Sequence, residues 1–89
     1  IEVRLPSILH AYTEAEVVEG AGSTLDELLT DLDSRHTGLR DRVVDGGGLR
    51  RFVNVYLNDE DVRFLDGINT KVADGDNVTI LPAVAGGMA

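Results

Sequence analysis

Leucines in the first half of the sequence follow the spacing of one helix face, and this pattern limits the folds open to the chain. They stand three and four residues apart: Leu25, Leu28, Leu29 and Leu32. Either Ser23 or Thr24 can serve as the N-cap, with an acidic residue three positions on, and Gly38 is placed to end the helix. A chain of 89 residues with one such helix can bury these leucines only against a sheet. We therefore expect an α+β domain.

Short segments rich in β-branched and aromatic residues surround this helix. They are residues 1–9, 14–19, 52–57, 62–64 and 77–81. Residues 10–13 suit a hairpin loop, residues 39–44 a short helical turn, and the glycines at 46–48 a flexible connector. Two hairpins separated by a helix make the first and last strands parallel neighbours. The sequence therefore predicts a β-grasp (ubiquitin-like) fold, with a mixed sheet of four to five strands packed on one main helix.

Charge and composition exclude several classes of function. The chain has 8 basic and 16 acidic side chains and a net charge of −8, so nucleic acid and anionic membranes would repel it. It contains no cysteine, which removes thiol nucleophiles, iron–sulfur clusters and zinc ribbons. No apolar run approaches a bilayer span, and the first residues do not resemble a signal peptide. We expect a soluble, cytoplasmic protein.

Other polar groupings have plain structural explanations. Asp59, Glu60 and Asp61 lack the ligand spacing of a calcium loop, and Asp74 and Asp76 flank a glycine as ordinary turn residues. The two histidines stand far apart in the sequence, and no serine lies in a nucleophile-elbow context. We expect no catalytic residue and no metal site.

The last residues differ in composition from the rest of the chain. Residues 83–89 are small and uncharged and include Gly86 and Gly87. Such a segment is expected to be extended and mobile, and paired glycines can enter a channel that a Cβ atom would block. We divide the chain into a globular domain at residues 1–82 and a flexible C-terminal tail at residues 83–89.

Two stretches of sequence carry a resemblance to a known family. Residues 74–87 run from Asp-Gly-Asp through an apolar strand and Pro82 to Val-Ala-Gly-Gly, and residues 51–63 add a second continuous likeness. In both, the chain resembles the ubiquitin-like sulfur-carrier (MoaD/ThiS-like) family, and within it the carriers of cysteine biosynthesis most. The resemblance implies a β-grasp protein that is a co-substrate rather than an enzyme.

The resemblance also implies the chemistry of the tail. An E1-like adenylating enzyme would use ATP to activate the Gly87 carboxylate, and sulfur would displace AMP to leave a thiocarboxylate, with Gly86 allowing the close approach. The carrier would donate this sulfur to a biosynthetic enzyme that makes cysteine or another sulfur-containing metabolite such as a thiosugar. ATP and the sulfur source would be used by the activating enzyme, with no cofactor bound by this chain. The alternatives are a small subunit of molybdopterin synthase and a ubiquitin-like modifier joined to lysines through Gly87.

Met88 and Ala89 depart from the family pattern, because they turn the Gly87 carboxylate into an amide. One explanation is a natural extension that a peptidase removes, with a JAMM-type metalloprotease as the candidate partner. The other is that the two residues were added to the natural sequence. We favour the first and expect the free protein to be a monomer.

The final strand predicts a partner-binding surface beside the tail. Val78 and Ile80 should face the helix, which turns Leu81 to the other side of the sheet. We assign partner binding to a set of mostly apolar residues around this point: Leu81, Pro82, Ala83, Val84, Ala85, Phe52 and Val62, with Tyr56 as a further candidate.

Three arginines form a basic grouping near these strands. Arg50 and Arg51 precede the segment at 52–57, and Arg63 lies in the segment at 62–64. Charged residues at a sheet edge block pairing with other chains, which is our first interpretation. The second is a contact with an acidic surface of the activating enzyme.

Overall fold

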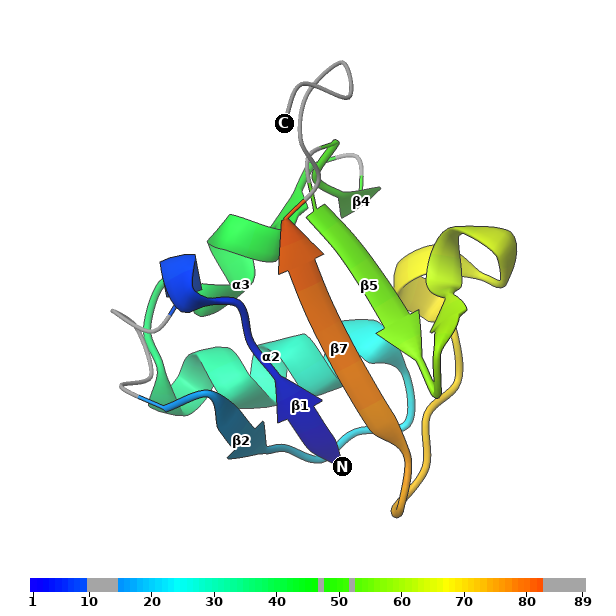
Figure 1. Cartoon of the computed structure of the whole chain (residues 1–89), viewed down its shortest axis with the longest axis horizontal. Helices are drawn as coiled ribbons and strands as arrows, with labels where there is room; N and C mark the ends of the chain where they lie inside the picture. The colour runs from blue at the N-terminus through cyan, green and yellow to red at the C-terminus, as the bar shows by residue number, and fades with distance from the viewer. Residues whose placement is uncertain (10–14, 47, 52, 83–89) are drawn as a thin grey trace.

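A five-stranded mixed sheet forms one layer of the protein, with strand β7 at its centre (Figure 1). The computed structural model describes residues 1–9, 15–46, 48–51 and 53–82. In spatial order the strands are β2 (Val17–Glu19), β1 (Glu2–Arg4), β7 (Asn77–Pro82), β5 (Val53–Leu57) and β6 (Glu60–Asp61). β1 and β7 are parallel, and the other neighbouring pairs are antiparallel. This arrangement confirms the predicted β-grasp fold and the parallel pairing of the first and last strands.

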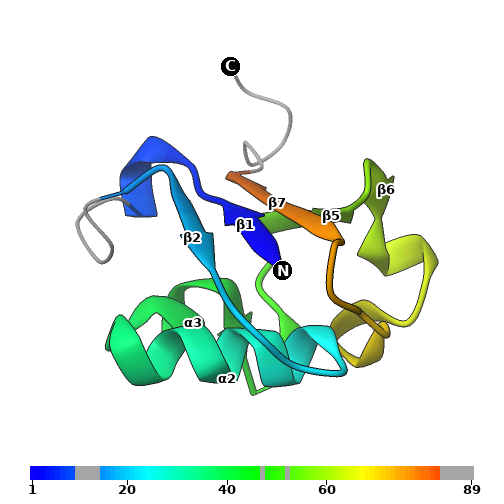
Figure 2. The same ribbon diagram turned by 90° about the horizontal axis from the view of Figure 1, so that it is seen from below.

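The main helix, α2 (Leu25–Arg35), lies across one face of the sheet (Figure 2). Its N-cap is Thr24, whose Oγ1 accepts a hydrogen bond from the Glu27 backbone N–H at 3.2 Å. The Glu27 carboxylate in turn accepts from the Ser23 N–H at 2.9 Å. These bonds satisfy backbone donors that the start of a helix otherwise leaves open. All four leucines of the predicted stripe are at most 1% exposed, so the sheet buries them as expected.

The chain leaves α2 before it reaches Gly38. The helix ends at Arg35, and Gly38 takes a left-handed conformation with φ of 95°, which suits glycine because it has no Cβ atom. This turn starts the short helix α3 (Leu39–Val43), where the sequence predicts a helical turn. Leu39 and Val43 of this helix are fully buried and extend the core.

The hydrophobic core lies between the sheet and α2. Alternation along β7 puts Val78 and Ile80 into it, each 1% exposed, as the sequence predicts. β1 contributes Val3 and β5 contributes Val55, both fully buried. Burial of apolar surface is the main favourable contribution to folding, and a domain of this size buries only a modest share of its surface.

The first strand is shorter than predicted. It covers only Glu2–Arg4, and Ser7–Leu9 forms a 3₁₀ turn, η1. Pro6 explains the early end, because it has no N–H to give to the sheet ladder. The predicted hairpin loop at residues 10–13 lies outside the described residues.

The prediction of a strand at residues 62–64 is wrong, because Val62–Phe64 is a 3₁₀ turn, η2. The strand comes before it, as β6. Asn58 and Asp59 have left-handed conformations, with φ of 50° and 73°, and these fold the chain straight back onto β5. Asp61 then ends the strand by capping η2, since its carboxylate accepts a hydrogen bond from the Arg63 N–H at 2.9 Å.

The predicted glycine connector is a small hairpin instead. β3 (Val44–Asp45) pairs antiparallel with β4 (Gly48–Leu49), and Gly48 has a φ of 116° that a residue with a side chain rarely adopts. Gly47 lies outside the described residues. The hairpin stands beside a third 3₁₀ turn, η3 (Gly67–Asn69).

Candidate functional site

The outer face of the sheet, which points away from α2, carries the exposed side chains of the central strands. Side chains alternate along a strand, so the burial of the two inward residues of β7 places Thr79 and Leu81 outside. The register of β5 pairs Tyr56 with Thr79 and Asn54 with Leu81. Because directly opposed residues share a face, these four side chains form two adjacent rows.

Leu81 is the apolar centre of this face. Its side chain is 44% exposed, as the sequence predicts, and it lines a shallow hollow of about 260 Å³ together with Tyr56, Asp59 and Thr79. We call Tyr56, Thr79 and Leu81 the outer-face patch. An exposed leucine beside an aromatic ring is a composition typical of surfaces that contact other proteins.

Pro82 is the last residue of β7 and the last that the structure describes, at the end of the central strand of Figure 1. It is exposed and lies opposite Val53. β7 pairs with β1 as far as Thr79 and with β5 as far as Pro82. Several predicted site residues lie outside the described residues, and their roles stay predictions: Phe52, Ala83, Val84, Ala85, Gly86, Gly87, Met88 and Ala89.

Val62 does not belong to any surface patch. It is 1% exposed and packs in the core, so its assignment to partner binding is wrong. The assignment assumed a strand at residues 62–64, whereas the 3₁₀ turn η2 directs Val62 inward.

The structure brings Arg50 and Arg63 together at the edge of β5. Arg63 donates from Nη1 to the Asn54 side-chain oxygen at 2.8 Å and from Nη2 to the Arg50 carbonyl at 2.7 Å. Arg50 donates from Nε to the Asp41 carbonyl at 2.6 Å. The Asn54 side chain belongs to the part of β5 that β6 does not pair, and edge protection stays our first interpretation. All three acceptors are neutral, so the bonds leave the positive charges in place.

Phe64 was missed by the sequence reasoning. Its side chain is 85% exposed at the end of η2. A strand at residues 62–64 would place Val62 and Phe64 on the same face, whereas the turn buries one and exposes the other. No signal in the sequence alone marks this separation, because it depends on the 3₁₀ conformation.

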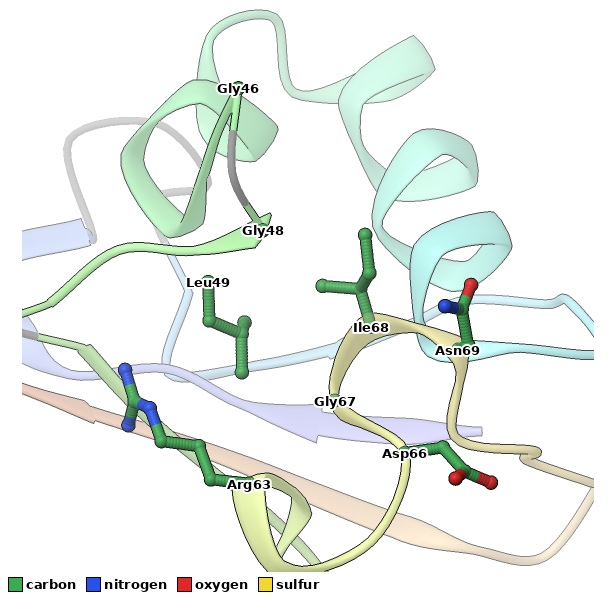
Figure 3. A pocket seen from close by; sticks show the side chains of 8 residues that line it. All are labelled: Gly46, Gly48, Leu49, Arg63, Asp66, Gly67, Ile68 and Asn69. Carbon is green, nitrogen blue, oxygen red and sulfur yellow. The ribbon is translucent and has the colours of Figure 1, made fainter.

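A second hollow lies between the β3–β4 hairpin and η3 (Figure 3). Its volume is about 690 Å³, and its lining combines glycines, two aliphatic side chains and three polar ones: Gly46, Gly48, Leu49, Arg63, Asp66, Gly67, Ile68 and Asn69. The lining includes neither a hydroxyl nucleophile nor a histidine. Within the described ranges, no group of three or more acidic or histidine side chains is placed to hold a metal ion.

On α2, Asp31 and Arg35 form an ion pair. Asp31 accepts from Arg35 Nη2 at 3.0 Å and from the Ala21 N–H at 2.9 Å. The hydrogen bond from Arg35, followed by that from the Ala21 N–H, holds the pKa of the Asp31 carboxyl below its usual value. The hydrogen bond from the Ala21 N–H to Asp31 therefore connects the segment before α2 to the helix. In the part of the chain that the structure covers, no helix is long and apolar enough to cross a membrane.

Comparison with known proteins gives a consistent result. The ThiS family model matches residues 3–87. Sulfur carrier protein CysO of Mycobacterium tuberculosis is 48% identical over 91 residues, which cover 98% of each chain. The crystal structure of the BexX/CysO complex of Amycolatopsis orientalis contains a chain with 50% identity and a TM-score of 0.90, covering 97% of this chain and 98% of the other. Small archaeal modifier protein 3 of Haloferax volcanii is 38% identical over 65 residues, 73% of this chain and 71% of that protein.

Proposed function

This chain belongs to the ThiS family, and we propose that it is a sulfur carrier protein whose C-terminal Gly87 bears the sulfur. The observation that carries the proposal is the 48% identity to a sulfur carrier over nearly the full length of both chains. The relatives that it matches over that length are named as carriers rather than enzymes. We therefore assign no catalytic residue to the chain, which acts as a protein co-substrate in the cytoplasm.

The proposed reaction uses the chain terminus. A peptidase, for which a JAMM-type metalloprotease is our candidate, first hydrolyses the bond between Gly87 and Met88 and frees the Gly87 carboxylate. A carboxylate oxygen then attacks the α-phosphorus of ATP on an E1-like enzyme, pyrophosphate leaves, and an acyl adenylate forms. Hydrosulfide attacks the acyl carbon and AMP leaves, which yields the thiocarboxylate. No side chain of the carrier reacts, which suits a chain without cysteine.

The fold supports this use of the terminus. β7 lies between β1 and β5, and its last residue, Pro82, is still paired with Val53 of β5. The outer-face patch stands next to Pro82, and we propose that Leu81 and Pro82 dock the partner enzymes. The final sulfur acceptor would be an enzyme that makes cysteine or a related metabolite such as a thiosugar. The CysO of Amycolatopsis orientalis, in complex with BexX, supports recognition of this fold by a partner enzyme.

Intact mass spectrometry tests the proposal. A variant that ends at Gly87, incubated with the activating enzyme, ATP and sulfide, should gain the difference between the atomic masses of sulfur and oxygen. The chain that retains Met88 and Ala89 is the matched control and should gain nothing. A gain by the control, or none by the truncated variant, contradicts the role of Gly87.

A second candidate function is conjugation to other proteins. The 38% identity to a small archaeal modifier protein favours it. In conjugation, a lysine ε-amine would attack the acyl adenylate of Gly87 in place of hydrosulfide. An amide bond would form and AMP would leave. Lysines of other proteins that carry residues 72–87 after tryptic cleavage at Lys71, measured by peptide mass spectrometry, would identify this activity. Their absence would leave the carrier function alone.

A further inference from the structure

Phe64 is the most exposed large apolar side chain among the described residues. It is 85% exposed, compared with 66% for Ile8, 44% for Leu81 and 38% for the adjacent Leu65. An aromatic ring in water is the kind of group that gains most from burial at an interface. Phe64 and Leu65 together present an apolar projection that neither the core nor the outer-face patch uses.

The turn that carries Phe64 is well fixed. Val62 anchors it in the core at 1% exposure. Asp61 caps it by accepting from the Arg63 N–H at 2.9 Å, and the Leu65 N–H donates to the Val62 carbonyl at 3.0 Å. The ring therefore projects from an ordered turn, which lowers the conformational entropy lost on binding.

Arg63 gives the projection a positive charge. Its guanidinium donates to the Asn54 side chain at 2.8 Å and to the Arg50 carbonyl at 2.7 Å. Both acceptors are neutral, so the guanidinium keeps its positive charge beside Phe64, although the carboxylates of Asp61 and Asp66 flank the same turn. A partner surface with carboxylates is complementary to this spot, and that charge pairing would set the orientation of the complex.

The projection is continuous with the outer-face patch. Arg63 binds Asn54, and Asn54 lies opposite Leu81 in the register of β5 and β7. The guanidinium is thus at the level of Leu81, on the side of β5 away from β7. A single protein that covers Leu81 and receives the chain beyond Pro82 can reach Phe64 across one strand.

We propose that Arg63, Phe64 and Leu65 form an edge anchor that enters an apolar cavity rimmed by carboxylates on the enzyme that activates the C-terminal segment. This inference rests on the proposed function and adds a second contact to it. The outer-face patch and the tail give the partner access to the terminus. The edge anchor sets the orientation of the carrier in the complex with that partner.

Steady-state kinetics of pyrophosphate release test the anchor. The substrate is the chain ending at Gly87, given to the activating enzyme with ATP and sulfide, so that hydrosulfide displaces AMP and completes each turnover. The Phe64→Ala variant should raise KM for the carrier about tenfold or more with kcat unchanged, because it removes binding but leaves the terminus intact. Arg63→Gln should raise KM less and weaken its dependence on salt.

Two control variants match these changes elsewhere on the surface. Ile8→Ala removes another exposed apolar side chain, on η1, and should leave KM unchanged. Lys71→Gln removes an exposed positive charge beside Thr24, at the start of α2, and should leave both KM and its salt dependence unchanged. Equal effects in these controls would overturn the anchor.

The other outcomes separate the anchor from the proposed function. No pyrophosphate release with the unsubstituted chain contradicts the proposed function. Release with an unchanged KM for Phe64→Ala overturns the anchor alone. A marked fall in the unfolding temperature of Phe64→Ala would mean that the ring stabilises the fold, and would also overturn it. A dimer that forms at high concentration and is lost in Phe64→Ala would assign the projection to a second copy of the chain instead.

Discussion

The two faces of β7 differ in burial, and by our proposal the inner face serves stability and the outer face recognition. On the inner face, Val78 and Ile80 are each 1% exposed and pack in the core. On the outer face, Leu81 is 44% exposed and stands next to Pro82, the last residue of β7. Neighbouring residues of one strand thus meet opposite demands, because successive side chains point to opposite faces. Substitutions one position apart should therefore affect different properties.

The inner face should show the largest effect. Ile80→Ala removes buried methyl groups and leaves a cavity, so it should lower the free energy of unfolding by about 2–5 kcal/mol. Urea unfolding followed by circular dichroism measures this change. Thr79→Ala is the neighbouring control on the outer face and should cost much less. Equal losses would mean that the two faces do not differ as described.

The outer face should respond in binding rather than in stability. Leu81→Glu places a charge in the outer-face patch and should raise KM for the activating enzyme at least tenfold, about 1.4 kcal/mol, with the unfolding midpoint almost unchanged. Asn77→Asp adds a charge near the other end of the same strand and should leave KM unaffected. An unchanged KM for Leu81→Glu would remove Leu81 from the docking surface.

Removing the N-cap of α2 should have a smaller effect, on the free energy of unfolding and not on binding. Thr24→Ala removes the hydroxyl that caps α2 and should cost about 1 kcal/mol of unfolding free energy. Ser23→Ala is the matched control, because Ser23 contributes its backbone N–H to Glu27, and that bond survives the change. Thermal unfolding of both variants makes the comparison. A change in KM for either would show that α2 also takes part in docking.

The ion pair between Asp31 and Arg35 on α2 should give the smallest effect, and one that depends on pH. The hydrogen bond from Arg35 lowers the native pKa of Asp31, so the ionised form is favoured by folding. The stabilisation is complete above the unfolded-state pKa of about 3.9 and is lost as the pH falls through the lower native value. At pH 7, the Asp31→Asn variant should therefore have a slightly lower unfolding temperature than the unsubstituted chain.

Measurements at acidic pH test the contribution of the Asp31–Arg35 ion pair. Below the native pKa of Asp31, both chains are neutral at this position, so the charge contribution to the difference in their unfolding temperatures should vanish. The unfolding temperatures of Asp31→Asn and of the unsubstituted chain, measured from neutral to acidic pH, give this difference at each pH. A difference that stays constant with pH would mean that the Arg35 contact stabilises without using the carboxylate charge.

The sequence predicted the elements whose signals are local or periodic. The leucine stripe located α2, the Thr24 cap was one of two candidates, and alternation in β7 separated Ile80 from Leu81. The parallel pairing of β1 and β7 followed from the order of hairpins and helix. For the leucine stripe and for β7, the residue pattern and the final environment depend on the same period, so one could be read from the other. The cap and the parallel pairing followed from local capping chemistry and from connectivity.

The sequence predicted less where two backbone conformations compete. The segment at residues 62–64 has residues that favour strands, yet Asp61 caps a 3₁₀ turn there, which buried Val62 and exposed Phe64. The glycines at 46–48 lacked any pattern, although β3 and β4 pair across them. Tertiary contacts decide such segments, and the edge anchor became visible only with them.

The place of β7 in the sheet also governs when the protein can be recognised. β7 is central in space but follows the other described strands in the chain. During synthesis, the leucines of α2 have no complete sheet to pack on until β7 has left the ribosome. Contacts between such distant segments also slow folding. An unfinished chain would therefore lack both the folded patch and the two glycines that follow it, so synthesis and folding together would keep incomplete carriers from an activating enzyme.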